Sequence, residues 1–128
     1  RDVERSRGLG DVYKRQADFR VILDASPATK GHVLILPKQH YANMFEMDDE
    51  VLAKAAKLAK KVITHEKEVL GCDGYNVLQN NGEAAGQTVF HFHMHLIPRK
   101  AGDQAVPEWE HLSLSDDEMK EICDKMKM

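Results

Sequence analysis

The stretch Phe90-His-Phe-His-Met-His-Leu-Ile-Pro98 places three of the chain's seven histidines at every second position, with apolar side chains between them. Side chains of an extended strand point alternately to its two faces, so His91, His93 and His95 are expected on one face. The apolar face is expected to consist of Phe90, Phe92, Met94 and Leu96. The pattern predicts a strand over residues 88–97 with one face in the core and the other in a functional site.

Three imidazoles on one face point to chemistry rather than to packing. Buried polar groups need hydrogen-bond partners, and three adjacent rings would need several at once. One interpretation is a metal site, because imidazole binds zinc and copper and the His-x-His spacing brings two rings to one ion. However, no His-Glu-x-x-His or Cys-x-x-Cys motif supplies further ligands. A second interpretation is covalent catalysis, in which a neutral imidazole attacks an electrophile while its neighbours orient it or transfer a proton.

The loop before the histidines is rich in glycine and polar residues. Gly82 and Gly86 flank a bend that is expected to bring backbone N–H groups, together with Asn80, Gln87 and Thr88, toward the start of the histidine face. Concave arrays of N–H donors bind phosphate oxygens. A donor nest beside a nucleophile suggests phosphoryl or nucleotidyl transfer, although the same loop also serves as a plain hairpin connection in many proteins.

The remaining patterns predict an α+β fold. Further strand patterns cover residues 18–23, 32–36 and 75–79. A long helical pattern over residues 50–70 ends at Gly71, and a capping box at residues 115–118 begins a final helix that runs to the C-terminus. Neighbouring strands with one long and one terminal helix favour a mainly antiparallel sheet. We expect an uncertain tail over residues 1–16 and a single domain over residues 17–128.

Charge and composition argue against several classes of partner. The 18 Lys and Arg and the 21 Asp and Glu give a formal net charge of −3, without a long block of one sign. This balance is not that of a nucleic-acid or membrane-surface binder. The sequence contains neither an apolar run of ~20 residues nor a signal-peptide pattern. The two cysteines form no ligand-like pair and fit a reducing compartment, so a cytoplasmic protein is expected.

Two blocks of the sequence resemble a known family. Gly86-Gln-Thr-Val-Phe-His-Phe-His-Met-His-Leu-Ile-Pro98 resembles the histidine triad signature, in which three histidines alternate with apolar residues after Gly-Gln-Ser/Thr-Val. Residues 24–40, Asp-Ala-Ser-Pro-Ala-Thr-Lys-Gly-His-Val-Leu-Ile-Leu-Pro-Lys-Gln-His, are similar to the second block that the family shares. The resemblance covers residues 19–103. It implies a mainly antiparallel, five-stranded-type sheet with one long central helix, usually in a homodimer whose sheets join.

The resemblance also implies an activity and a set of site residues. It implies a nucleotide hydrolase or transferase that forms a covalent nucleotidyl-histidine intermediate at the α-phosphate. His93 would be the nucleophile, His95 would contact the phosphate, and the backbone carbonyl of His91 would accept from the second nitrogen of His93. His32 would support the site, and Asp24 would bind the ribose hydroxyls. The positions that match ribose and phosphate contacts are Asn80, Gly86, Gln87 and Thr88.

Several substrates and protein classes are compatible with the sequence. The short chain and the block at residues 24–40 resemble the branch that hydrolyses AMP phosphoramidates, whereas Gly-Gln-Thr-Val at residues 86–89 with residues 98–103 is equally close to the fragile-histidine-triad type. We expect the first branch, with a purine nucleotide derivative as the substrate. The alternative is the fragile-histidine-triad type, which cleaves dinucleoside polyphosphates and shares the same intermediate. Two further candidates are a nucleotide-binding module with little catalysis and a metal-dependent hydrolase that uses the trio as ligands.

The resemblance makes a negative prediction about metal. Many bacterial members bind structural zinc through an N-terminal Cys-x-x-Cys and two histidines, which here would be His40 and His91. Residues 1–16 contain no cysteine, and tight structural sites need four ligands, so structural zinc is not expected. No other cofactor is implied. Trp109 and His111 lie where short-chain members shape the leaving-group pocket, although a single tryptophan more often simply packs.

Overall fold

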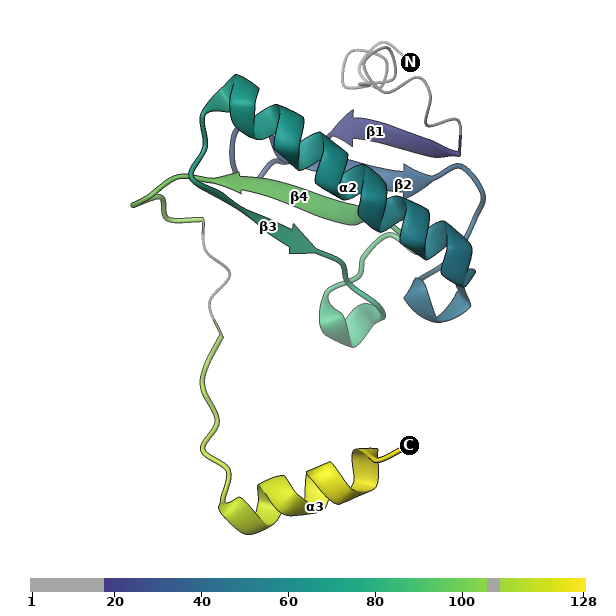
Figure 1. The fold of residues 1–128 in the computed structure, drawn as a ribbon, viewed down its shortest axis with the longest axis vertical. Helices are drawn as coiled ribbons and strands as arrows, with labels where there is room; N and C mark the ends of the chain where they lie inside the picture. The colour runs from purple at the N-terminus through teal and green to yellow at the C-terminus, as the bar shows by residue number, and fades with distance from the viewer. Residues whose placement is uncertain (1–17, 106–108) are drawn as a thin grey trace.

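The computed structural model describes residues 18–105 and 109–128, so the predicted tail at residues 1–16 lies outside the described residues. The described residues form one antiparallel sheet with the strand order β1-β2-β4-β3 (Figure 1). Its strands are β1 (Phe19–Leu23), β2 (Val33–Pro37), β3 (Gly74–Leu78) and β4 (Met94–Arg99). The predicted α+β class and antiparallel sheet are confirmed. The described part of the chain contributes four strands to this sheet, where a five-stranded type was expected.

Helix α2 (Asp49–Leu70) crosses one face of the sheet (Figure 1). The helix ends as predicted at Gly71, which takes the left-handed conformation (φ 67°) and donates its N–H to the carbonyl of Lys67. Gly71 has no Cβ, so this left-handed ending costs it little. The helix buries a stripe of small and branched apolar side chains toward the sheet: Ala55, Leu58, Ala59 and Val62.

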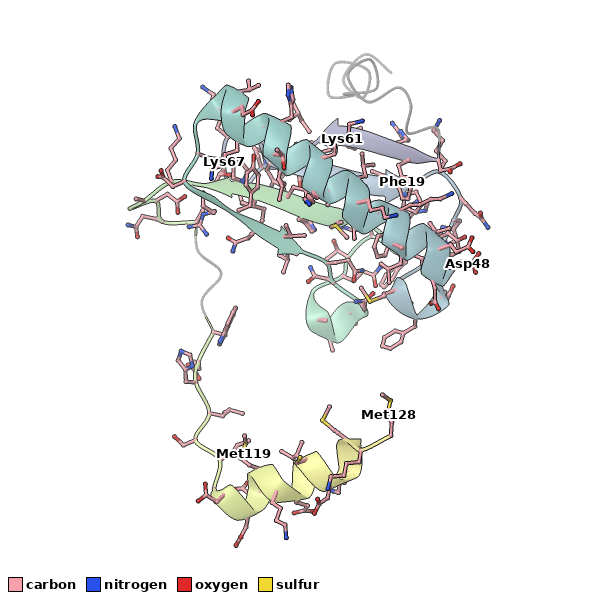
Figure 2. The ribbon with its side chains drawn as sticks, viewed as in Figure 1. Phe19, Asp48, Lys61, Lys67, Met119 and Met128 are labelled. Carbon is pink, nitrogen blue, oxygen red and sulfur yellow. The ribbon has the colours of Figure 1, made fainter. Side chains whose placement is uncertain are left out.

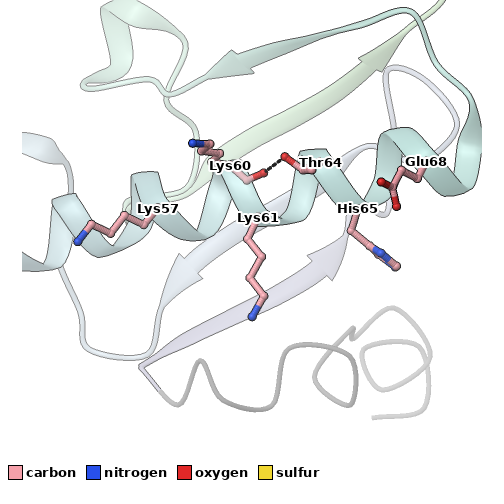
Figure 3. A pocket seen from close by; sticks show the side chains of 6 residues that line it. All are labelled: Lys57, Lys60, Lys61, Thr64, His65 and Glu68. Atoms are coloured by element: carbon pink, nitrogen blue, oxygen red, sulfur yellow. Dashed lines mark hydrogen bonds between the residues drawn. The ribbon is translucent and has the colours of Figure 1, made fainter.

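The opposite side of α2 carries its lysines. Lys57, Lys60 and Lys61 line a shallow polar hollow together with Thr64, His65 and Glu68 (Figure 3). These side chains are exposed, as expected for the polar face of an amphipathic helix, and Thr64 donates its hydroxyl to the carbonyl of Lys60 at 2.7 Å. This hollow is on the outer side of the helix and does not include the histidine trio.

The core lies between α2 and the sheet and fixes which face the trio occupies. Phe92, Met94 and Leu96 are buried in the main core cluster with Val33 and Ile35 of β2. Because alternate residues of a strand face opposite ways, His95 points away from α2. The alternation predicted from the sequence is therefore confirmed for these three apolar residues.

The strand that carries the histidines is shorter at its start than predicted. β4 begins at Met94, whereas the prediction placed the strand at residues 88–97. Residues 88–93 are held by loop contacts instead of a strand ladder. For example, the Phe92 N–H donates to the Tyr41 carbonyl at 2.6 Å. Phe90 is 51% exposed, so its expected place on the core face is wrong.

Helix α3 (Asp116–Met126) begins at the predicted capping box. The Ser115 side chain accepts from the Glu118 N–H, and the Glu118 side chain accepts from the Ser115 N–H. All residues of α3 are exposed, including Met119 (Figure 2). Neither α3 nor any other helix among the described residues is long and apolar enough to cross a membrane.

Candidate active site

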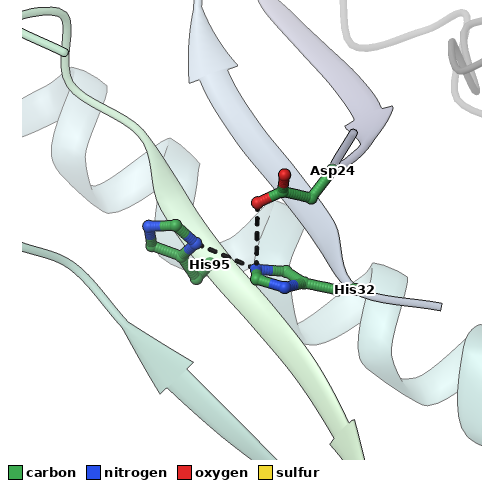
Figure 4. Close-up of side chains that lie close together, drawn as sticks. All are labelled: Asp24, His32 and His95. Carbon is green, nitrogen blue, oxygen red and sulfur yellow. Dashed lines mark hydrogen bonds and ion pairs between the residues drawn. The ribbon is translucent and has the colours of Figure 1, made fainter. Parts of the chain in front are cut away.

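Three side chains meet where β1 ends, β2 begins and β4 passes (Figure 4). Asp24 follows β1, and its N–H donates to the carbonyl of His32, which precedes β2, at 2.9 Å. His95 is paired with Leu34 in the ladder between β2 and β4, so its ring lies beside that of His32. The ring centroids of the two histidines are 5.1 Å apart. The sheet thus brings together residues that are 63 positions apart in the chain.

Hydrogen bonds fix the proton positions of His32 and His95. The N–H of Ala28 donates to Nδ1 of His32 at 2.9 Å, so the proton of the neutral ring lies on Nε2. Nε2 of His32 is 2.9 Å from Nδ1 of His95, which must therefore be the acceptor. In neutral His95 the proton then lies on Nε2. The inner pair, as we call His32 and His95, presents an N–H donor to the site.

His93 has the complementary arrangement. Its Nδ1 is 2.8 Å from the backbone carbonyl of His91. A carbonyl oxygen only accepts, so the proton is on Nδ1 and the lone pair of Nε2 is left for an electrophile. The rings of His93 and His95 lie edge to face with centroids 5.0 Å apart. An unprotonated ring nitrogen and an N–H donor are therefore neighbours, and the contact from His93 to the His91 carbonyl implied by the resemblance is present.

Burial sets the protonation of the inner pair. Burial, with smaller contributions from His93 and His32, lowers the pKa of His95 to about 4. Burial also lowers the pKa of His32, and the carboxylate of Asp24, 3.5 Å from Nε2, opposes this shift. Both rings are consequently neutral near pH 7. In the free site, His95 is a neutral donor rather than a resident cation.

The loop at residues 79–88 is held together by its own polar groups. Gln87 is 2% exposed, and its side chain accepts from the Gly82 N–H at 2.8 Å and donates to the carbonyls of Ala42 and Val89 at 2.6 and 3.1 Å. The N–H groups of Gly86 and Gln87 donate to carbonyls within the loop. The predicted nest of donors is therefore not formed by these amides. The Gln87 side chain braces the loop.

The remaining predicted contact residues of this loop lie near its ends. Asn80 is two positions beyond Leu78, which pairs with His95 in the ladder between β3 and β4. A Cβ at Gly86 would come within 3.7 Å of the Asn80 amide nitrogen, and Gly86 itself adopts φ +93°. Thr88 is exposed. The positive φ of Gly86, rather than a lack of room for a Cβ, therefore favours glycine at this turn beside Asn80.

The side chains that the structure describes at this site do not fit a metal ion. Ligand atoms of Asp24, His32 and His95 lie within 4.8 Å of one another. However, a neutral imidazole has one lone pair, and that of His32 already accepts from the Ala28 N–H, so Nε2 cannot also bind a metal. His40 and His91 belong to no group of three such ligands within the described residues. Two ligands fall short of the four that structural zinc requires.

The structure also brings together His40 and His91, the two histidines that the family resemblance pairs as zinc ligands in many bacterial members. Nδ1 of His40 is 2.9 Å from Nδ1 of His91, and Nε2 of His91 is 2.7 Å from the Pro37 carbonyl. The resemblance named these two residues together, but their direct hydrogen bond was not predicted from the sequence. Trp109 is 74% exposed on the segment before α3, and no described contact joins it to the histidines.

A class of protein follows from this geometry: an α+β sheet protein in which a ring nitrogen with a free lone pair lies beside a neutral imidazole donor. Comparison with known proteins narrows the class. The model of the HIT domain matches residues 11–102. The chain therefore belongs to the HIT domain family, the histidine triad family whose signature its sequence resembles.

Individual relatives agree with this membership. The chain is 49% identical over 84 residues to an uncharacterized HIT-like protein of Methanocaldococcus jannaschii, a match that covers 66% of this chain and 64% of that protein. It is 41% identical to the adenosine 5'-monophosphoramidase hnt1 of Schizosaccharomyces pombe, over 82% of this chain and 80% of that one. The crystal structure of a histidine triad nucleotide-binding protein from Candida albicans superposes with a TM-score of 0.76 at 35% identity, covering 87% of this chain and 81% of that one.

Proposed function

We propose that this protein is a nucleotide hydrolase that acts on the α-phosphate of purine nucleotide derivatives, with AMP phosphoramidates as the substrate class. The observation that carries the proposal is the fixed tautomer of His93, whose Nε2 lone pair lies beside the donor His95. The fission yeast relative is an adenosine 5'-monophosphoramidase, which supports the substrate class. Covalent catalysis needs this pairing of a nucleophile with a proton-transfer partner.

In the proposed first step, Nε2 of His93 forms a bond to phosphorus as the P–N bond breaks. The bound phosphate anion favours the protonated form of His95, which the free site lacks. The added proton enters at Nδ1 in place of the hydrogen bond from His32, and the Nε2 proton passes to the departing amine, which leaves the Nε2 lone pair as the later acceptor. The nucleotidyl ring keeps its Nδ1 proton, and the carbonyl of His91 stabilises the positive charge that develops there. Water then attacks phosphorus, His95 takes its proton, and AMP leaves with His93 restored.

The substrate contacts are part of the proposal. Asp24 would accept from the ribose hydroxyls through Oδ1, because its Oδ2 lies beside His32. In the free protein Oδ1 accepts from the Ser26 N–H at 2.8 Å. Asn80, Gly86 and Thr88 would contact the ribose and phosphate, and Gln87 would act through the loop that it braces. No cofactor is required in this scheme, because each proton transfer uses a histidine of the chain.

We further propose a cytoplasmic homodimer joined through β3. This strand is at one edge of the sheet, and its Tyr75 hydroxyl donates to the carboxylate of Glu66 on α2 at 2.6 Å. Exposed apolar side chains lie on these two elements: Val69, Leu70, Val77 and Leu78. An unpaired edge strand with apolar neighbours is a common site for sheet extension between copies. The two free cysteines, Cys72 and Cys123, fit a reducing compartment.

The decisive experiment compares His93→Ala with the unchanged protein on adenosine phosphoramidate. We expect turnover to fall by ~10³-fold or more, because the nucleophile is lost. Mass spectrometry after quenching without acid should show an adenylyl adduct on the unchanged protein alone. His65→Ala on α2 is the matched control. Full turnover by His93→Ala would contradict the proposal, and nucleotide affinity without turnover or adduct would assign a binding module.

A substrate panel separates the two hydrolase alternatives. Adenosine phosphoramidate and a dinucleoside triphosphate are compared by kcat/KM on the same preparation. Faster cleavage of the phosphoramidate supports the proposed branch, and faster cleavage of the dinucleoside substrate assigns the fragile-histidine-triad type. Both substrates would yield the same nucleotidyl-His93 adduct, so this panel tests the leaving group alone.

A further inference from the structure

A second histidine pair lies beside the proposed nucleophile. The outer pair, as we call His40 and His91, has an Nδ1 to Nδ1 distance of 2.9 Å and ring centroids 5.1 Å apart at a tilt of 42°. His40 follows β2 and is exposed, whereas His91 is partly buried. The mechanism above uses the backbone carbonyl of His91 but not the ring of either residue. The outer pair therefore needs its own explanation.

The proton positions in the outer pair follow from its third contact. Nε2 of His91 is 2.7 Å from the carbonyl of Pro37 and must be the donor, since the carbonyl only accepts. The Nδ1 of neutral His91 then carries a lone pair. His40 must consequently donate from its own Nδ1. The ring of His91 is held at both nitrogens, by Pro37 on one side and by His40 on the other.

The peptide unit between His91 and Phe92 links the outer pair to the proposed nucleophile, His93. The carbonyl of His91 accepts from Nδ1 of His93 at 2.8 Å. The N–H of the same peptide bond belongs to Phe92 and donates to the Tyr41 carbonyl at 2.6 Å. Because a peptide unit is planar, fixing its N–H and the side chain next to it also fixes the direction of its carbonyl. The orientation of His93 thus depends on the segment from Pro37 to Tyr41, which includes His40.

We propose that His40 is a positioning residue for the nucleophile, acting through the ring of His91. This inference rests on the proposed function for its kinetic consequence. His40 does not touch the reacting atoms. Its donor hydrogen bond keeps the His91 ring against Pro37, and the carbonyl of His91 then holds the Nε2 lone pair of His93 in one direction. A nucleophile that is free to rotate would reach phosphorus in fewer encounters.

Two substitutions at one position test the inference. His40→Leu removes the donor. His40→Asn retains one, because the side-chain nitrogen of Asn and the Nδ1 of His are both two bonds from Cβ. We expect kcat on adenosine phosphoramidate to fall about tenfold in His40→Leu with KM little changed, and to recover to within about threefold in His40→Asn. His65→Leu is the control for loss of an exposed histidine. The proteins are treated with chelator beforehand so that no metal bridges the pair.

A readout independent of activity completes the test. Nitrogen-15 NMR of the imidazoles should show His93 protonated at Nδ1 in the unchanged protein and in His40→Asn, with this signal weakened by exchange in His40→Leu. Wild-type kcat together with an intact His93 signal in His40→Leu would overturn the inference, as would equal losses of kcat in both variants. If the unchanged protein hydrolyses neither substrate, the proposed function fails, and the NMR comparison alone decides the role of His40.

Discussion

The inner and outer histidine pairs have nearly the same geometry and different surroundings. Each pair joins two ring nitrogens at 2.9 Å with centroids 5.1 Å apart. In the inner pair His32 is 5% exposed, and burial lowers the pKa of both rings. In the outer pair His40 is exposed. The same type of hydrogen bond therefore has a different proposed role in each pair. In the inner pair it sets which nitrogen of His95 carries the proton, and in the outer pair it holds the direction of the His91 carbonyl.

The largest effect expected from this comparison is the loss of the inner donor. His95→Asn removes the imidazole that transfers the proton, and we expect kcat/KM on adenosine phosphoramidate to fall by about 10²- to 10⁴-fold. The tenfold effect of His40→Leu on the outer pair is the matched comparison. Steady-state rates and thermal unfolding of both variants provide the measurement. Equal losses from the two substitutions would show that the pairs do not differ in role.

A second prediction concerns the scaffold behind the outer pair. The buried amide of Gln87 ties the loop at residues 79–88 to the carbonyl of Ala42, two positions from His40. Gln87→Leu leaves partly buried backbone groups such as the Gly82 N–H unpaired, so we expect a loss of about 1–3 kcal/mol in the free energy of unfolding. Urea denaturation measures this loss. The exposed Gln104→Leu should change stability by less than about 0.5 kcal/mol, and equal effects would refute the bracing role.

Local signals predicted the helices and much of the site. The end of α2 at Gly71 and the capping box of α3 depend on residues within one turn, so the sequence suffices to locate them. The alternation of Phe92, Met94 and Leu96 with histidines likewise follows from one strand. The grouping of Asp24, His32 and His95 came from the family resemblance, since residues 63 positions apart carry no local sign of contact.

The errors arose where tertiary contacts override a local pattern. The sequence of residues 88–93 alternates as in a strand. However, the Phe92 N–H donates to the Tyr41 carbonyl and the Gln87 side chain donates to the Ala42 carbonyl, so this region bonds to a loop instead of to a neighbouring strand. Phe90 consequently faces solvent. The same long-range contacts explain why the hydrogen bond of His40 was not predicted. An alternating hydrophobic pattern predicts which side of a single strand is buried. The conformation of residues 88–93 depends instead on contacts with a second segment of the chain.

The smallest expected effect is on the pH dependence of stability. It concerns the inner pair, in which His95 takes up its proton at a lower pH in the folded protein than in the unfolded chain. Because the folded protein lowers the pKa of His95 to about 4 from 6.5, the unfolded chain binds more protons between these values. Stability is therefore complete above pH 6.5 and falls as the pH decreases toward 4. We expect Tm to decrease by a few degrees over this window and His95→Asn to reduce the decrease, while both curves run parallel above pH 7. Identical slopes below pH 6.5 would mean that His95 takes up its proton as readily in the folded site as in the unfolded chain, and the assigned neutral donor would then be wrong.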